Sequence, residues 1–207
     1  MSNETKKYEL VKSESIVHNG RTLYRIRALR EFTISRGVAI KVGDIGGFVE
    51  SENNLSQEDI CWIFDDAKVY ENAKICGDAK ICCDAKVFGN AKVWGDAFVL
   101  DDAEVWGNAK ICDKARIFGK AAIFENAEIS DYSQVYENAI VSDTAWVFGN
   151  AKIYGNANIF FMTKKTIGWL ALRRLTRKLV PSSMRKSQSF GNPTKTKPKR
   201  KYTTTGT

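Results

Sequence analysis

Several residue types on which catalytic and membrane proteins depend are rare in this sequence. Histidine occurs only once, at His18, beside the sequence Asn19-Gly20 that predicts a hairpin turn, and we expect it to be structural. No apolar run approaches the roughly 20 residues of a membrane-spanning helix. Residues 1–7 are polar and no apolar segment follows them, so we expect no signal peptide. These scarcities disfavour histidine-based catalysis, a transmembrane protein and a secreted protein.

The most regular feature of the sequence is an uninterrupted repeat. Residues 65–160 divide without insertion or deletion into sixteen hexapeptides, from DDAKVY to GNANIF. The third position is alanine in all of them except at Ser133, and the fifth is always valine or isoleucine. The second position is mostly Asn or Asp, and the first is often Gly or an acid. A fixed short period of this kind is the signature of a solenoid.

Each hexapeptide predicts one short strand and one corner. Positions three to six alternate between inward and outward side chains, which is the period of a half-buried strand, and positions one and two are turn residues. Three such units close most simply into one triangular turn of eighteen residues, so stacked Val and Ile columns fill a narrow core. Burying each branched side chain contributes about 1.5–3 kcal/mol. We therefore predict an all-β fold, a parallel β-helix over residues 59–160.

The chain resembles the left-handed β-helix family of hexapeptide-repeat proteins, best known from trimeric bacterial acyltransferases. The usual motif places an aliphatic residue first and a small residue four positions later, as Val69 and Ala73 do here. Glycine stands one place later than is common, as in Val87-Phe88-Gly89-Asn90. The resemblance implies a left-handed coil and homotrimers, whereas crossovers between parallel strands are otherwise nearly always right-handed.

Residues 1–58 are not repetitive and predict a β-rich cap over the open end of the coil. Strands are expected at Lys7–Val11 and Thr22–Arg30, and sharp turning at Gly43–Gly47. A degenerate hexapeptide, Asp59–Phe64, then places Cys61 in the alanine position. The motifs of residues 21–32, 43–51 and 54–57 before Cys61-Trp62 resemble YdcK-like proteins of bacteria and phages. That resemblance implies a bacterial or phage setting and supplies no active site.

The outward surface is the expected place for function. Position six is rich in aromatic residues, and stacking of hexapeptides eighteen residues apart aligns Tyr70, Phe88, Trp106 and Phe124 on one face. Such a ladder stabilises parallel strands, but an exposed apolar stripe also indicates a partner. We take these four residues as a possible interaction face. Self-association is the first partner to consider, with an unknown protein as the second.

Enzyme and metal interpretations find little support in the residue inventory. The acyltransferases of this family generally use a histidine base, and the only one here lies upstream of the repeats. The acids Asp101, Asp102 and Glu104 could serve as bases in principle, but they occupy ordinary turn and outward positions of the repeat. The chain has five cysteines, an odd number without disulfide spacing, and the repeat directs Cys76, Cys82 and Cys83 to different faces or corners. We expect reduced thiols, a cytoplasmic location, and no catalytic residue, cofactor or metal.

The C-terminal part carries the positive charge. The last acid is Asp143, and residues 161–207 contain thirteen Lys and Arg, so residues 1–160 carry −5 of the net +8. Residues 161–181 predict an amphipathic helix ended by Pro181, which either packs on the coil or lies on an anionic membrane surface. Residues 182–207 predict a disordered basic tail. It either aids solubility or contacts a polyanion, nucleic acid or membrane, through Lys195, Lys197, Lys199, Arg200 and Lys201.

Three functions remain open at this point. The first is a non-enzymatic scaffold for interaction or assembly, of phage or bacterial origin, that binds a protein partner through the aromatic face. The second is a divergent hexapeptide acyltransferase whose catalytic group cannot be located. The third is a polyanion-binding protein in which the tail makes the contact and the coil serves as a rigid spacer.

Overall fold

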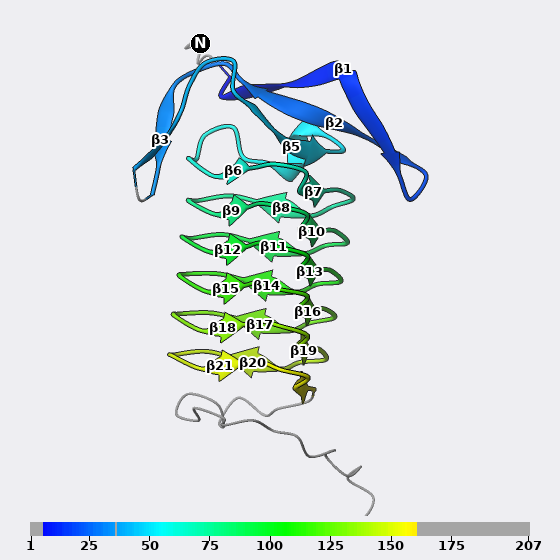
Figure 1. Ribbon diagram of the computed structural model, residues 1–207, viewed down its shortest axis with the longest axis vertical. Helices are drawn as coiled ribbons and strands as arrows, with labels where there is room; N and C mark the ends of the chain where they lie inside the picture. Colours follow the sequence, from blue (N-terminus) through cyan, green and yellow to red (C-terminus); the bar gives the residue numbers. More distant parts are fainter. Residues whose placement is uncertain (1–5, 36, 161–207) are drawn as a thin grey trace, which may run out of the picture. The chain divides into compact units, whose positions relative to one another are not determined.

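The repeat forms a parallel β-solenoid of about six turns. A computed structural model describes residues 6–35 and 37–160 of the chain (Figure 1). In every hexapeptide the strand occupies positions four and five, and the fifth-position side chain is buried. The predicted all-β fold with a parallel β-helix is confirmed, because the alternation of Ala and Val or Ile inward with polar residues outward leaves one apolar face to bury.

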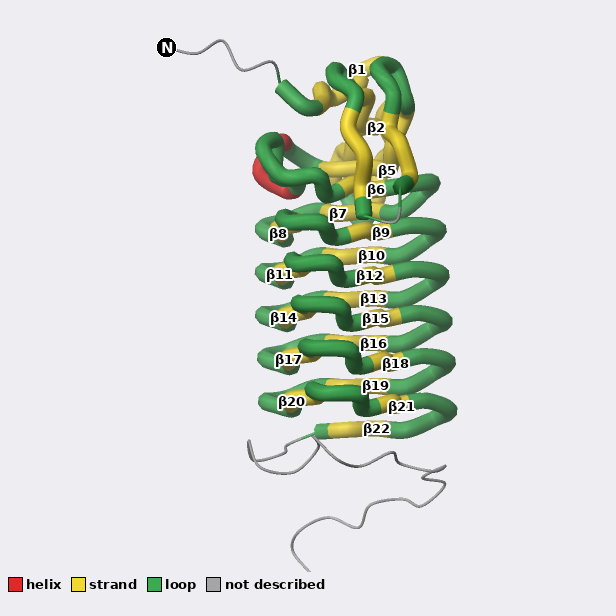
Figure 2. The backbone as a smooth tube through the Cα atoms, turned by 90° about the vertical axis from the view of Figure 1, so that its left-hand side faces the viewer, coloured by secondary structure: helices red, strands yellow, loops and turns green. Residues whose placement is uncertain are grey.

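The strands stack into three faces around the coil (Figure 2). The first face contains β7 (Lys68–Val69), β10 (Lys86–Val87), β13 (Glu104–Val105), β16 (Ala122–Ile123), β19 (Ile140–Val141) and β22 (Asn158–Ile159). The second face contains β8 (Lys74–Ile75), β11 (Lys92–Val93), β14 (Lys110–Ile111), β17 (Glu128–Ile129) and β20 (Trp146–Val147). The third face contains β6 (Trp62–Ile63), β9 (Lys80–Ile81), β12 (Phe98–Val99), β15 (Arg116–Ile117), β18 (Gln134–Val135) and β21 (Lys152–Ile153).

Neighbouring strands on each face pair in parallel with a shift of eighteen residues. Lys92 lies beside Lys74 and Lys110, for example, and Val93 beside Ile75 and Ile111. This register places each hexapeptide position directly above the same position of the next turn. Outward side chains therefore form vertical columns at the strand spacing of about 4.8 Å.

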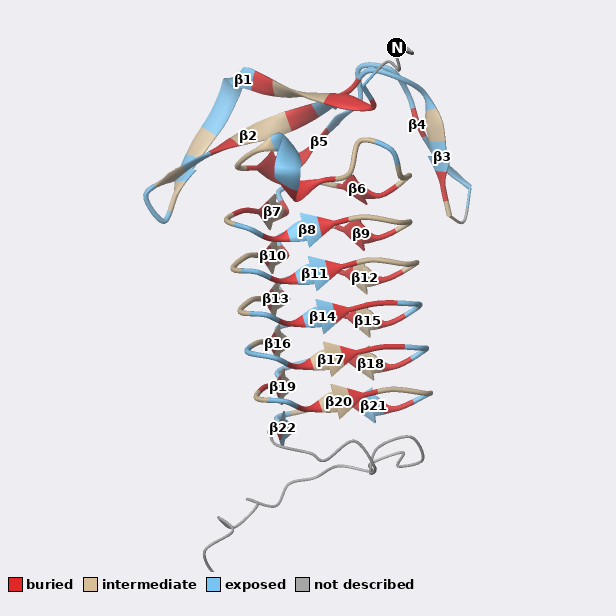
Figure 3. Ribbon diagram, turned by 180° about the vertical axis from the view of Figure 1, so that it is seen from behind, coloured by how far each residue is buried: buried red, intermediate tan, exposed pale blue. Residues whose placement is uncertain are grey.

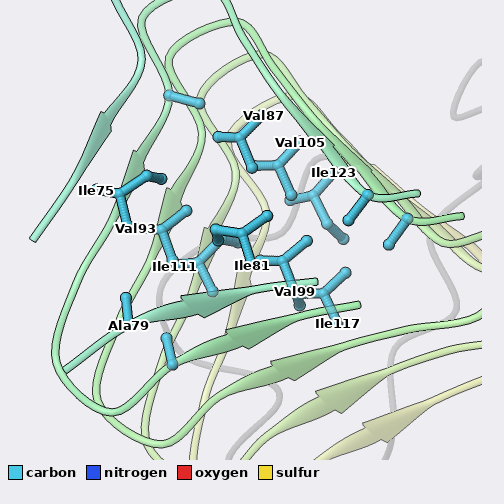
Figure 4. Packing of buried hydrophobic residues seen from close by; sticks show 14 of the residues in the cluster. Ile75, Ala79, Ile81, Val87, Val93, Val99, Val105, Ile111, Ile117 and Ile123 are labelled. Atoms are coloured by element: carbon cyan, nitrogen blue, oxygen red, sulfur yellow. The ribbon is translucent and has the colours of Figure 1, made fainter. Parts of the chain in front are cut away.

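The core is a set of inward columns (Figure 4). The fifth-position residues have at most 2% exposure, and nearly all of the third-position alanines are equally inaccessible. Alanine fits there because the chain turns immediately before it and leaves little room. The exception, Ser133, keeps its buried hydroxyl satisfied by donating to the carbonyl of Ser130 at 2.6 Å. The core expected from the sequence is confirmed.

Corner formation depends on the first position of the hexapeptide. All sixteen first-position residues have positive φ, between +51° at Asp65 and +72° at Gly155. Seven of them are glycine, and eight of the other nine are Asp or Glu. An added Cβ at Gly107 would lie 2.7 Å from the backbone nitrogen of Glu125 in the next turn, so the corners are closely stacked. The sequence assigned this turn geometry to positions one and two together, but only position one adopts it.

The N-terminal region forms two hairpins. β1 (Tyr8–His18) and β2 (Arg21–Ala28) pair antiparallel through a turn in which Asn19 and Gly20 have φ of +49° and +75°, as predicted from their sequence. The first strand was predicted to end at Val11, but it continues to His18 after an irregularity in the pairing between Val11 and Ser15. The second hairpin consists of β3 (Phe32–Ile34) and β4 (Val38–Ile40), which pair antiparallel.

Parallel pairing begins before the first recognisable hexapeptide. β5 (Ile45–Val49) pairs antiparallel with β2 and in parallel with β7, and Leu55 forms a parallel bridge with Ile75. Between them lies the 3-10 helix η1 (Glu52–Asn54). The structure thus adds β5 and Leu55 ahead of β6, which lies within the predicted hexapeptide Asp59–Phe64, and the three complete a further turn. The sequence placed the start of the coil at residue 59 because this earlier turn has no repeat pattern.

Close packing explains why Gly46 and Gly47 of β5 are glycine. The predicted turn at residues 43–47 is wrong in its extent: Gly43 turns with φ +91°, whereas Gly46 and Gly47 lie within β5. A Cβ on Gly46 would lie 2.6 Å from the carbonyl oxygen of Ile63. These two residues are therefore glycine because the backbone of the first turn approaches them closely.

Apolar side chains of the N-terminal region continue the core of the coil. Tyr8 is fully buried, its ring lies edge-on to Trp62 at 6.4 Å, and its hydroxyl donates to the carbonyl of Leu55 at 2.8 Å. Phe32 contacts the same Trp62 ring at 5.5 Å. The predicted helix of residues 161–181 and the predicted disordered tail of residues 182–207 lie outside the described residues.

Candidate functional site

The aromatic side chains of the first face form a continuous stacked ladder. Ring centroids lie 5.0 Å apart between Tyr70 and Phe88, 5.7 Å between Phe88 and Trp106, and 4.5 Å between Trp106 and Phe124. The ring planes are parallel within 8°. The structure therefore brings together all four residues of the predicted interaction face, because the eighteen-residue shift places each ring beneath the previous one.

The ladder is less exposed than its outward position predicts. Tyr70 is only 2% exposed, and Phe88, Trp106 and Phe124 are half-buried. Phe88 and Trp106 each lie between two stacked rings, so their flat sides are covered by neighbouring rings. The expectation of a contiguous exposed apolar stripe is wrong to this extent, and the surface available to a partner is the rim of three rings.

The first ring is covered by the N-terminal hairpin. Tyr70 packs in one cluster with Leu23 of β2 and Phe48 of β5, and Ile16 of β1 lies against it. The ring of His18 meets the edge of Tyr70 at 5.4 Å. The ladder thus already holds an apolar partner from its own chain at its first position. No described segment joins this cluster at Trp106 or Phe124.

His18 has the surroundings of a packed residue. Its Nε2 is buried and has no hydrogen-bond partner within the described residues. Burial, followed by the nearby Lys68 and Lys86, lowers the pKa of His18, and Glu104 opposes this shift. A histidine base needs a substrate proton and an orienting partner within hydrogen-bond reach, and Nε2 of His18 has no such partner among residues 6–35 and 37–160.

The corner acids have a structural use that the sequence did not suggest. Seven first-position acids accept a hydrogen bond from the backbone N–H of the residue eighteen positions later. Distances run from 2.7 to 3.1 Å, with Asp101 accepting from Gly119 at 2.9 Å and Glu125 from Asp143 at 2.7 Å. This assigns Asp101, one of the acids considered as a possible base, to the stacking of the corners. The eighteen-residue separation was the signal that could have revealed it.

Second-position asparagines form another ladder. At the corner between the first and second faces, each side-chain amide nitrogen donates to the next side-chain oxygen at 3.1–3.2 Å, in the series Asn72, Asn90, Asn108 and Asn126. Amide ladders of this type stabilise stacked parallel strands. These polar residues therefore act on the solenoid itself.

A shallow hollow of about 530 Å³ lies on the first face beside the ladder. It exists because Ala122 stands at position four, where the turns above carry longer side chains. Its walls include Lys86, which donates to Glu104 at 2.8 Å, and the exposed Asp102 and Lys120. Acids and lysines alternate there. Within residues 6–35 and 37–160, no cluster of three or more His, Cys, Asp or Glu side chains could hold a metal ion.

The buried polar groups of the upper coil are paired. Lys7, which is fully buried, donates from Nζ to the carbonyls of Asp59 at 2.7 Å and Cys61 at 3.0 Å. Burial lowers the pKa of Lys7. The nearby Cys61 thiol opposes this shift. Lys80 is 5% exposed and forms an ion pair with Asp96 at 3.0 Å. Lys7 thus links the N-terminal region to the start of the coil, and Lys80 links two neighbouring turns.

The thiols of Cys61 and Cys112 are in surroundings that disfavour the thiolate. Burial raises the pKa of Cys61 to about 11, and burial with the adjacent Asp113 raises that of Cys112 to about 12. The Sγ atoms of Cys82 and Cys83 lie 3.9 Å apart, and all five cysteines are free. A nucleophilic cysteine needs a lowered pKa, so these shifts oppose such a role for Cys61 and Cys112.

Two of the remaining predictions concern the tail and the membrane. The possible polyanion contacts Lys195, Lys197, Lys199, Arg200 and Lys201 lie outside the described residues. In the part of the chain that is described, no helix is long and apolar enough to cross a membrane.

No protein-family model and no curated protein matches the chain.

Proposed function

We propose that this protein is a non-enzymatic interaction or assembly scaffold, and that a protein partner binds the rim of the aromatic ladder. The observation that carries the proposal is the unequal cover of one column: Tyr70 is held by the hairpin, while Phe88, Trp106 and Phe124 keep exposed edges. Aromatic rings anchored in a rigid face lose little conformational freedom on binding, and they are the usual energetic centres of interfaces.

The use of the acids supports a scaffold over a catalyst. Asp101 and Glu125 are bonded to corner N–H groups, and Glu104 to Lys86, so these carboxylates stabilise stacked turns. A divergent hexapeptide acyltransferase remains the alternative enzyme, and it would need a base other than these. The polyanion-binding alternative rests on the charge of residues 161–207.

We also propose membership of the hexapeptide-repeat left-handed β-helix proteins, with the YdcK-like proteins of bacteria and phages as relatives. The unbroken six-residue period and the buried fifth position support the first assignment, and the order of N-terminal motifs supports the second. On the basis of this proposed membership, we further propose that the protein forms a homotrimer and is cytoplasmic in a bacterial cell or a phage-infected host.

The scaffold proposal is tested by replacing the exposed rings. In Phe88→Ser with Trp106→Ser, binding of a protein partner should be lost, measured by photo-crosslinking from position 124 in host lysate. The matched control is Phe118→Ser with Tyr136→Ser, which removes an equivalent stacked pair at 4.7 Å from the third face. Equal crosslinking in both double variants, at equal folded fractions by circular dichroism, would show that the rings only stabilise the coil.

A further inference from the structure

A column of unpaired lysines lies on the second face. Lys74, Lys92 and Lys110 occupy position four of three successive turns and stand directly beside one another in the parallel register. All three side chains are exposed, and none of them forms an ion pair with a described residue. Like charges directly opposite one another on a sheet are destabilising. Lys110 has Glu128 beside it on the next strand, so the coil leaves the charge of Lys74 and Lys92 without an acidic neighbour in this column.

The positions that flank the three lysines on either side are uncharged. On one side is the asparagine ladder of Asn72, Asn90 and Asn108, and on the other are Cys76, Trp94 and Cys112. The first hairpin packs on the first face through Tyr70, and Ser35 of the second donates to Asp96 at the corner between the second and third faces. The exposed strands β8, β11 and β14 are uncovered by either hairpin (Figure 3).

A complementary column lies at the opposite corner of the triangle. The second positions between the third and first faces carry, from the first repeat turn downward, Asp66, Asp84, Asp102, Lys120 and Asn138, and all five are exposed. At the same levels the second face carries Lys74, Lys92, Lys110, Glu128 and Trp146. The signs are opposite in each of the first four turns, including the fourth, where both columns reverse together.

These two columns cannot neutralise each other within one molecule, because the core of the coil separates a face from the corner opposite to it. The local partners of the corner are also limited. Asp66 is bound by Arg25 at 2.6 Å, and the neighbouring Lys86 is bound by Glu104 at 2.8 Å. Asp84 and Asp102 have no ion pair within the described residues.

We propose that the partner of the second face is the third–first corner of another copy of this chain, with the two coils parallel and their turns level. This deepens the proposed scaffold function and rests on it. The contact joins two different surfaces, so repetition closes into a ring or runs on as a row of coils. Exposed ion pairs supply register and specificity, while the nearby Trp94 and Trp146 supply apolar contact area.

The reversal in the fourth turn fixes the register. A shift of one turn in one direction brings Lys110 against Lys120, and in the other direction it brings Glu128 against Asp102. An antiparallel arrangement brings Lys92 against Lys120 and Glu128 against Asp84. Level, parallel coils bring opposite charges together in all four turns, which no shifted or antiparallel arrangement does, and charge patterns exclude wrong pairings in this way. A polyanion lying along the lysines would explain neither Glu128 nor the matching corner.

The test is a charge swap in the full-length chain, followed by sedimentation velocity over a concentration series. Lys92→Glu with Lys110→Glu should weaken self-association about tenfold or more, and so should Asp84→Lys with Asp102→Lys. The chain with all four changes should associate as the original does. Lys152→Glu, an exposed position outside both columns, is the matched control and should change nothing.

A zero-length carboxyl–amine crosslinker gives the second readout, with linked peptides identified by mass spectrometry. Links of Asp84 to Lys92 and of Asp102 to Lys110 are expected, and only between copies. Failure of the four-fold variant to recover association would overturn the proposal. The proposal would also be overturned if the original chain is monomeric and the lysine variants, but not the aspartate variants, lose binding of inorganic polyphosphate. Self-association that survives Phe88→Ser with Trp106→Ser separates this interface from the partner-binding ladder.

Discussion

At the residue scale, each hexapeptide position has one physical task. Position five fills the core, position three accommodates the corner, and position one adopts positive φ. The outward positions four and six carry the variation along the chain. Substitutions should therefore have effects that depend on position in the repeat more than on residue type.

An inward charge is the most severe single change expected. Ile111→Asp places a carboxylate in a column that is 0% exposed, where neither water nor a counter-ion reaches it. Its cost should be about 4 kcal/mol or more in the free energy of unfolding, measured by urea denaturation. The adjacent outward change Lys110→Gln should cost little. Equal midpoints for the two variants would contradict the proposed register.

His18 gives the protein a pH dependence of stability. Because burial and two lysines lower its pKa in the folded state, the unfolded state binds more protons at mildly acidic pH. Stability from this group is fully present above its unfolded pKa of about 6.5 and is lost as pH falls through the lowered folded value. His18→Phe should flatten the change in melting temperature between about pH 8 and about pH 5. An unchanged pH profile would show that His18 is solvated.

At the element scale, stability comes from contacts between turns. The Asn ladder, the aromatic ladders and the acid-to-N–H bonds all join residues eighteen positions apart. A corner can therefore be altered without disturbing the strand that follows it, and the effect should fall on the stacking of one turn upon the next.

Glu125 separates the two contributions of a corner acid. Its φ is +58° and its carboxylate accepts from the N–H of Asp143 at 2.7 Å. Glu125→Gly loses the bond but relaxes the backbone, whereas Glu125→Ala loses the bond and retains the strain. We expect a loss of about 1 kcal/mol for glycine and about 2 kcal/mol for alanine in urea unfolding. The reverse order would show that backbone strain is unimportant here.

At the scale of the whole molecule, charge is divided between two regions. Residues 1–160 carry −5 and residues 161–207 carry +13, so the net charge of +8 describes neither. Binding to polyanions should follow the second region and behave as counterion release.

Deletion of residues 181–207 tests that separation. Because the deleted segment carries basic and no acidic residues, binding to nucleic acid or anionic vesicles should be abolished, and binding by the full chain should fall steeply with salt. Fluorescence anisotropy with a labelled oligonucleotide measures nucleic-acid binding, and vesicle co-sedimentation measures binding to anionic vesicles. Binding retained by the truncated chain would assign it to residues 161–180, which keep six of the thirteen Lys and Arg, or to the coil.

The sequence alone determined the coil, its three-sided section and its core. A strict six-residue period leaves only one set of side chains able to face inward, and Val93 and Ile111 belong to that set by their position in the repeat. The N-terminal hairpin was predictable for the same kind of reason, because Asn19-Gly20 specifies its turn locally. These features depend on short-range chemistry repeated along the chain.

Only the tertiary structure decided the rest, because it depends on contacts between distant segments. The turn formed by β5 and Leu55 has no repeat pattern and exists through pairing with the next turn. The burial of Tyr70 depends on the hairpin of residues 8–28, and the half-burial of Phe88 on its neighbouring rings. Corner acids, among them Asp101, which the sequence left as a possible base, accept hydrogen bonds from backbone N–H groups. Stacking brings residues eighteen positions apart into contact, at 2.8 Å for Glu71 and 2.9 Å for Asp101.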